Sequence, residues 1–204
     1  MRKRILISVL TVAILGAASI FAYLRICDVN SNLPEATIEE YSLGEPAKLD
    51  GSFLASTAEE NKDYELTVIG AQRMSYNEYV SKYGSEKTQT EKGLDDKSII
   101  DVELKIRNNG SKLGCFSLYE MRLVPEQKNK YYIAQDSILK KSIETAPKWP
   151  NPISTEPHST FTIHIPFTVN SEDETITKGY IEGREFTLFL TDYPVSKRVI
   201  FNVD

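Results

Sequence analysis

An unbroken run of twenty uncharged residues, Ile5–Leu24, most constrains how this chain can fold. The run contains no proline, and it is flanked by Arg2, Lys3 and Arg4 on one side and by Arg25 on the other. As a helix rising about 1.5 Å per residue it covers roughly 30 Å, the thickness of the hydrocarbon core of a bilayer. The sequence therefore predicts one N-terminal transmembrane helix.

The basic residues before this run predict its orientation. They hold the N-terminus in the cytoplasm and leave residues 26–204 extracytoplasmic, so the protein is expected in the cell membrane as a single-pass chain. A cleaved signal peptide is an alternative, because Ala17–Ser19 offer small residues to a peptidase, and a lipoprotein is another, because Cys27 follows. The apolar run extends to Leu24 and the residues before Cys27 are not small, which favours an uncleaved signal-anchor.

Three segments follow from this assignment. Residues 1–25 form the cytoplasmic tip and signal-anchor, residues 26–40 a polar stalk, and residues 41–204 one extracytoplasmic domain. Removal of the four basic residues of the first segment, which has no acidic residue, leaves 20 basic and 29 acidic residues, a net charge of −9. Such an acidic domain is not expected to bind nucleic acid or an anionic lipid surface.

Alternating side chains predict a mainly β domain. In Ser98–Asn108, four aliphatic residues alternate with four charged ones, which indicates a strand with its charges in solvent and an antiparallel sheet. A short helix is expected over Tyr76–Gly84. Further strands are expected at Lys48–Ala55, Tyr64–Arg73, Cys115–Val124, Tyr131–Ala134, Thr160–Val169, Glu185–Thr191 and Arg198–Val203, the last two as a hairpin. This pattern predicts an antiparallel β-sandwich.

Three short motifs carry a resemblance to a known family. They are Tyr41-Ser-Leu-Gly44-Glu45, the strand ending in Asn108-Asn109-Gly110, and the Glu156–Ser159 turn before the aromatic strand Phe161–Phe167. Together they resemble uncharacterised immunoglobulin-like extracellular domains of Gram-positive bacterial membrane proteins and lipoproteins, over residues 41–204. The resemblance implies an immunoglobulin-like sandwich with no catalytic residues to transfer. The chain departs from the pattern at His158, where the family usually has glycine.

Motifs of catalysis and metal binding are missing from the sequence. The two histidines, His158 and His164, lie about 20 Å apart in an extended chain, too far to share a metal, and the phase of His164 predicts a surface position. No nucleophile and base are recognisable, so no catalytic residue, metal or cofactor is assigned and the protein is not expected to be an enzyme. Cys115 is expected as a small buried residue, with a bridge to Cys27 as the alternative.

Three aromatic residues are candidates for binding a partner. Trp149 stands in a proline-rich segment, and Tyr131 and Tyr132 open a short predicted strand. We expect a membrane-anchored, immunoglobulin-like binding module whose partner is another protein or a cell-wall component. The alternatives are an accessory or sensor subunit of a membrane assembly, with Ile5–Leu24 itself making contact, and an anchored hydrolase.

Overall fold

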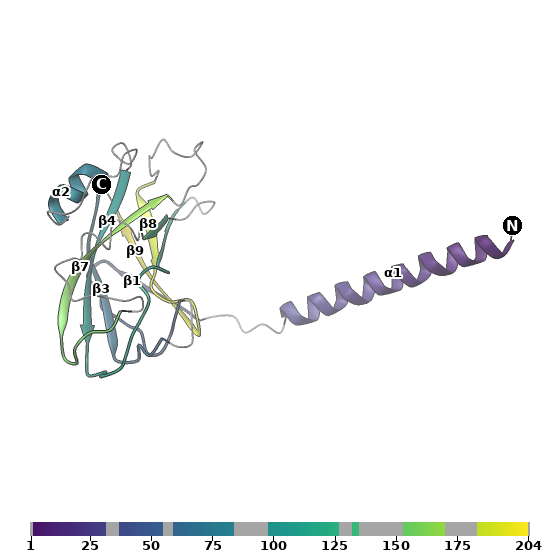
Figure 1. Ribbon diagram of the computed structural model, residues 1–204, viewed down its shortest axis with the longest axis horizontal. Coiled ribbons are helices and arrows are strands. Elements are labelled where there is room, and N and C mark those ends of the chain that lie inside the picture. The colour runs from purple at the N-terminus through teal and green to yellow at the C-terminus, as the bar shows by residue number, and fades with distance from the viewer. Residues whose placement is uncertain are drawn as a thin grey trace. The chain divides into compact units, whose positions relative to one another are not determined.

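The chain forms two compact units, Met1–Glu35 and Ala36–Asp204. The computed structural model describes residues 2–31, 37–54, 59–83, 98–126, 132–134, 153–169 and 183–203 (Figure 1). Helix makes up the described part of the first unit, and strands are the main regular structure in the described part of the second.

The described part of the first unit is one helix, α1, over Arg2–Ser31. It includes the whole uncharged run and continues through Arg25, which lies 3.5 Å from Asp28 one turn later. Its end at Ser31 shows that the first part of the predicted stalk is helical. Among the residues that the structure describes, no helix combines the length and the apolarity needed to cross a membrane.

The second unit is mainly β, as the alternation predicts, and its strands form one nine-stranded sheet. The order across the sheet is β1-β9-β8-β5-β6-β7-β4-β3-β2. The bounds are β1 Thr37–Ser42, β2 Ala47–Lys48, β3 Tyr64–Ser75, β4 Ser98–Asn108, β5 Arg122–Pro125, β6 Tyr132–Ala134, β7 Thr160–Val169, β8 Glu185–Phe189 and β9 Val195–Asn202, with helix α2 at Tyr76–Tyr83.

The prediction of a purely antiparallel sheet is wrong, because the strand at one edge is parallel to its neighbour. β1 pairs in parallel with β9, from Thr37 opposite Val195 to Ser42 opposite Ile200, which makes the sheet mixed. The prediction placed most of β1 in the stalk. After β1 the chain turns back onto β3, where the Gly44 amide donates to the Val68 carbonyl at 2.7 Å. The sheet therefore curls until its first and last edges approach each other.

The core lies inside this curled sheet. On β4 the four predicted aliphatic residues, Ile100, Val102, Leu104 and Ile106, are all fully buried, and β7 contributes Ile165 and Phe167. The predicted bounds of β4 and β7 are confirmed, as is the hairpin of β8 and β9. The expected exposure of all four charged residues on β4 is wrong, because Asp101 is only 1% exposed.

The end of β4 is fixed by the side chain of Asn108. Its Oδ1 accepts hydrogen bonds from the amides of Gly110 and Ser111, which closes the predicted turn. Its Nδ2 donates to the carbonyls of Ser111 and Thr155, so the fully buried amide is satisfied. His158 has a φ of 60°, in the left-handed region that favours glycine.

The segment predicted as a strand over Cys115–Val124 is shorter than expected. Only Arg122–Pro125 is a strand, and Phe116 forms an isolated bridge with Ile153. Glu120 and Arg122 share the phase of apolar residues in this segment, and a turn between Leu118 and Met121 absorbs that irregularity. Cys115 is half-buried and Cys27 is exposed, and these two described residues share no disulfide.

A polar candidate site beneath helix α2

The outer face of three neighbouring strands brings the candidate site together. The register sets Gln72 of β3 opposite Asp101 of β4, and Glu103 of β4 opposite His164 of β7. These residues alternate with core residues, so their side chains point away from the core. A register shift between Val68 and Gly70 lies beside them in β3.

Helix α2 lies next to this face and begins with a capping box. The Ser75 hydroxyl accepts from the Glu78 amide at 3.2 Å, and the Glu78 carboxylate accepts from the Ser75 amide at 2.7 Å. The hydrogen bonds with Ser75, chiefly the one from its backbone amide, hold the Glu78 pKa below its ordinary value. Tyr76 and Tyr79 then pack with Ile99 in a second, smaller apolar cluster. Tyr83 is partly buried and packs against the same cluster.

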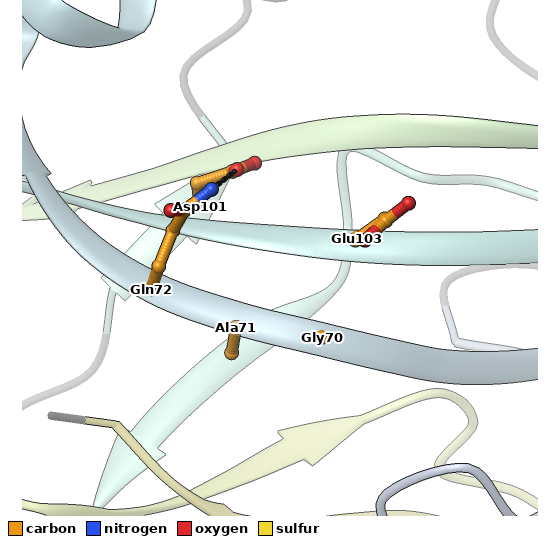
Figure 2. A pocket seen from close by; sticks show the side chains of 5 residues that line it. All are labelled: Gly70, Ala71, Gln72, Asp101 and Glu103. Carbon is orange, nitrogen blue, oxygen red and sulfur yellow. Dashed lines mark hydrogen bonds between the residues drawn. The ribbon is translucent and has the colours of Figure 1, made fainter.

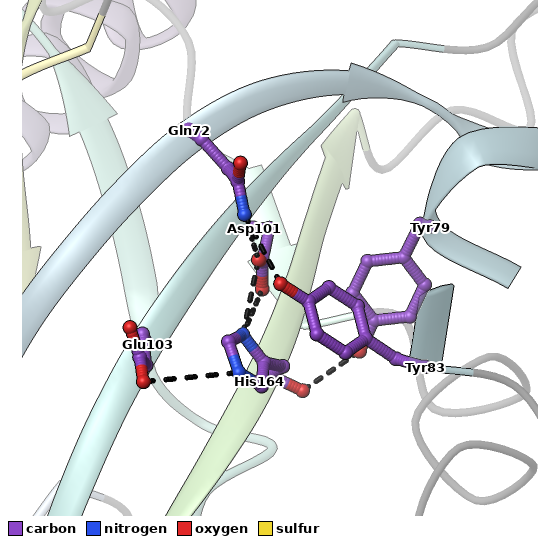
Figure 3. Close-up of polar contacts among 6 residues, drawn as sticks. All are labelled: Gln72, Tyr79, Tyr83, Asp101, Glu103 and His164. Carbon is purple, nitrogen blue, oxygen red and sulfur yellow. Dashed lines mark hydrogen bonds and ion pairs between the residues drawn. The ribbon is translucent and has the colours of Figure 1, made fainter. Parts of the chain in front are cut away.

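Asp101 and His164 are the centre of the site, as Figure 3 shows. The Asp101 carboxylate lies 3.0 and 3.2 Å from His164 Nδ1 and accepts from Gln72 Nε2 at 2.9 Å. The other ring nitrogen, Nε2, lies 3.9 Å from Glu103 Oε1. His164 lies on the outer face, as its phase predicts, but helix α2 partly covers it, so only 25% of its side chain is exposed.

Two tyrosines of α2 fasten the helix to His164. The Tyr79 hydroxyl donates to the His164 backbone carbonyl at 2.7 Å. The Tyr83 ring stacks on the imidazole with the centroids 3.9 Å apart, and its hydroxyl accepts from Gln72 Nε2 at 3.1 Å. Burial raises the pKa of Tyr83, and a hydrogen bond with Tyr83 raises the pKa of Lys82, so the phenol stays neutral and the ammonium charged. The name α2 site is used for these six residues, Gln72, Tyr79, Tyr83, Asp101, Glu103 and His164.

A shallow hollow of about 260 Å³ opens beside the α2 site. Gly70, Ala71, Gln72, Asp101 and Glu103 line it (Figure 2). A Cβ atom on Gly70 would come within 3.3 Å of the Glu103 carboxylate, so glycine leaves that side of the hollow open. The Asp101 carboxylate is buried and bound by Gln72 and His164, whereas 38% of the Glu103 side chain is exposed.

The hollow offers hydrogen-bond acceptors and negative charge. A partner group that donates hydrogen bonds, such as an amide or an amine, matches these atoms. Within the described ranges, no group of three or more His, Cys, Asp and Glu side chains is placed to hold a metal ion.

The structure describes one of the three aromatic residues predicted to bind a partner, Tyr132, and this residue is not part of the α2 site. Trp149 and Tyr131 lie outside the described residues. Tyr132 is 2% exposed and packs in the core with its ring centroid 6.3 Å from that of Phe186. One sequence signal points to the α2 site. Glu103 in β4 and His164 in β7 both stand at the non-core positions of strongly alternating strands.

Comparisons with known proteins identify a family for this chain but no individual protein that matches it. No curated protein and no solved structure is similar enough to count as a match. Residues 38–197 match the family described as Domain of unknown function (DUF5028), and this segment runs from β1 into β9. The chain belongs to this family of domains of unknown function.

Proposed function

We propose that the protein is a single-pass, membrane-anchored protein that displays an immunoglobulin-like binding module outside the cytoplasm. One observation carries the proposal: the twenty uncharged residues Ile5–Leu24 fall within the single helix α1, and the family domain follows as a separate compact unit. The basic residues before the run support a cytoplasmic N-terminus. An extracytoplasmic domain is consistent with the resemblance to domains of Gram-positive membrane proteins.

The immunoglobulin-like part of the proposal is supported by strand neighbours. In the constant-type fold one sheet holds strands A, B, E and D and the other holds C, F and G. With β3, β4, β5, β7, β8 and β9 as A, B, C, E, F and G, B lies between A and E, and F lies between C and G, in agreement with the observed order. β6 pairs with both β5 and β7 and so joins the two halves into one sheet, which is the departure from two separate layers.

Binding, rather than turnover, is the activity that the α2 site supports best. Asp101 and His164 engage each other, whereas the Glu103 carboxylate and the Gln72 side chain are accessible at the hollow. A protein or cell-wall component that presents an exposed hydrogen-bond donor, such as an amide or an amine, suits this hollow. Trp149 and Tyr131 remain additional proposed contacts.

A topology assay tests the proposal directly. Protease added to intact cells, with the wall removed, is expected to degrade residues 36–204 and to leave a protected fragment that contains Ile5–Leu24. A cytoplasmic marker protein, intact in the same sample, is the control. A domain that becomes degradable only after the membrane is permeabilised contradicts the proposal.

An exchange of the helix separates a tether from an assembly subunit. Ile5–Leu24 is replaced by an unrelated membrane anchor of the same length, and the function of the chain is then scored in cells. Retained function supports a displayed module. Lost function, with normal amounts of exported domain, supports the accessory or sensor subunit whose helix makes specific contacts.

A further inference from the structure

The first and last strands in chain order, β1 and β9, pair in a geometry that resists tension between the two ends of the chain. β1 and β9 run parallel, so the start of β1 at Thr37 and the end of β9 at Asn202 lie toward opposite ends of the ladder. Tension between the two ends of the chain then acts along both strands in opposite directions. All hydrogen bonds of the ladder are loaded together in shear, whereas a hairpin pulled from its open end separates one bond at a time.

A buried lysine reinforces the same joint. Lys197 of β9 is opposite Glu39 of β1, and its Nζ lies 2.8 Å from the Glu39 carboxylate and 3.6 Å from Asp50, which follows β2. Only 4% of the Lys197 side chain is exposed, against 42% for Glu39. The ammonium therefore joins β9 to β1 and to the segment that follows the opposite edge strand.

Tyr41 completes this group of residues. Its hydroxyl donates to the Glu39 carboxylate at 2.7 Å, and its ring packs against the core. The hydrogen bond from Lys197 is the main cause of the lowered pKa of Glu39, and burial is the main cause of the raised pKa of Tyr41. The carboxylate is thus charged and the phenol neutral at neutral pH, which is the arrangement that the hydrogen bonds need.

We propose that Lys197 and Glu39 form a latch that lets the β1–β9 ladder withstand force transmitted from the N-terminal segment to the rest of the domain. The inference rests on the proposed membrane anchor, because an anchored chain that binds a partner experiences tension at Thr37. The latch holds β1 in the sheet under that tension and keeps the module attached in its folded form.

Force spectroscopy on the full chain tests the latch. The chain is held by its two ends in detergent, and the unfolding rate at constant force is compared between the native chain and Lys197→Met. Methionine fills the site without charge, and the half-exposed Glu39 remains solvated, so the domain is expected to fold. The rate is expected to rise by roughly fivefold, the size of a charge-assisted hydrogen bond to a half-exposed partner.

The matched control is Arg122→Met, which removes a different ion pair, that of Arg122 with Asp192, away from β1. An unfolding rate for Lys197→Met that changes no more than the rate for Arg122→Met overturns the latch. Glu39→Gln adds a double-mutant cycle: together with Lys197→Met its effect is expected to be much less than the product of the two single effects.

Hydrogen exchange separates a latch from a general contribution to stability. In Lys197→Met the amides of β1 are expected to exchange about fivefold faster while those of β4 are unchanged. Equal acceleration in both strands overturns the latch. Both measurements use the purified chain, so a failed topology assay refutes the membrane anchor separately, and unchanged unfolding and exchange refute the latch.

Discussion

Asp101 and His164 are 63 positions apart in the chain, yet the carboxylate accepts a hydrogen bond from the imidazole across 3.0 Å. Each comes from a strand whose alternate residues form the core, so both side chains would ordinarily point to solvent. Helix α2 changes that environment because the Tyr83 ring covers the imidazole. Gln72 Nε2 donates to both the Tyr83 hydroxyl and the Asp101 carboxylate. The burial of the carboxylate is thus matched by hydrogen bonds rather than left uncompensated.

Replacement of Asp101 is expected to destabilise the domain strongly. Asp101→Ala leaves His164 Nδ1 without its acceptor and removes one of the two acceptors of Gln72, so the free energy of unfolding falls by about 2 kcal/mol. Equilibrium unfolding in urea measures the change. Arg107→Ala, at an exposed position of the same strand, is the control and shifts the free energy by less than about 0.5 kcal/mol. Equal effects of the two variants contradict the assigned network.

The hydroxyl of Tyr79 is expected to determine how firmly α2 is held. Tyr79→Phe removes the donor to the His164 carbonyl and keeps the ring, which costs about 1 kcal/mol. Hydrogen exchange of the α2 amides is expected to accelerate roughly fivefold. Tyr193→Phe, on a half-exposed ring away from α2, is the control and leaves these amides unchanged. Unaltered exchange in Tyr79→Phe shows that the hydroxyl does not hold the helix.

Much of the fold was accessible from the sequence because local patterns coincide with the tertiary environment. The bounds of β4 and β7 follow from strict alternation, and the short helix expected over Tyr76–Gly84 corresponds to α2 at Tyr76–Tyr83. These signals depend on a few neighbouring residues. They are sufficient where one face of an element meets the core and the other meets solvent.

The features that were not predicted depend on partners far along the chain. β1 is mostly polar, and its strand conformation comes from pairing with β9, where Glu39 meets Lys197 158 positions later. Asp101 looked like a solvent-facing charge because no local pattern reveals that α2 covers it. Prediction of the α2 site therefore requires the register of three strands and the position of a helix, and local sequence patterns give neither.

Gly114 is expected to tolerate no side chain. A Cβ atom there would lie 2.5 Å from the Glu60 carbonyl oxygen, which is held by the Cys115 amide, and closer still to the Ser111 hydroxyl. Gly114→Ala is expected to cost about 1–3 kcal/mol through backbone displacement, seen as a lower Tm by several degrees. Gly70→Ala is the control, because its nearest neighbour is the movable end of the Glu103 side chain. A Tm for Gly114→Ala no lower than that of Gly70→Ala contradicts the expected clash with the Glu60 carbonyl.

Acid is expected to weaken the joint between β1 and β9. The Glu39 pKa lies below its ordinary value of 4.5, chiefly because Lys197 donates a hydrogen bond to it and secondly because Tyr41 does. Asp50 and Glu45 also lie in the electrostatic environment of Tyr41. A lowered folded-state pKa contributes stability that is present above the ordinary value and is lost as pH falls through the folded-state value.

The measurement is the free energy of unfolding in urea between about pH 3 and pH 7, the range that spans the ordinary carboxyl pKa, for the native chain and for Glu39→Gln. Since 42% of the Glu39 side chain is exposed, solvent screening limits the difference to below about 1 kcal/mol at neutral pH. The difference is expected to shrink toward zero at the acid end, where the carboxyl of the native chain is protonated and resembles the amide. A difference that stays constant across the whole range shows that the ionised carboxylate does not stabilise β1 through Lys197.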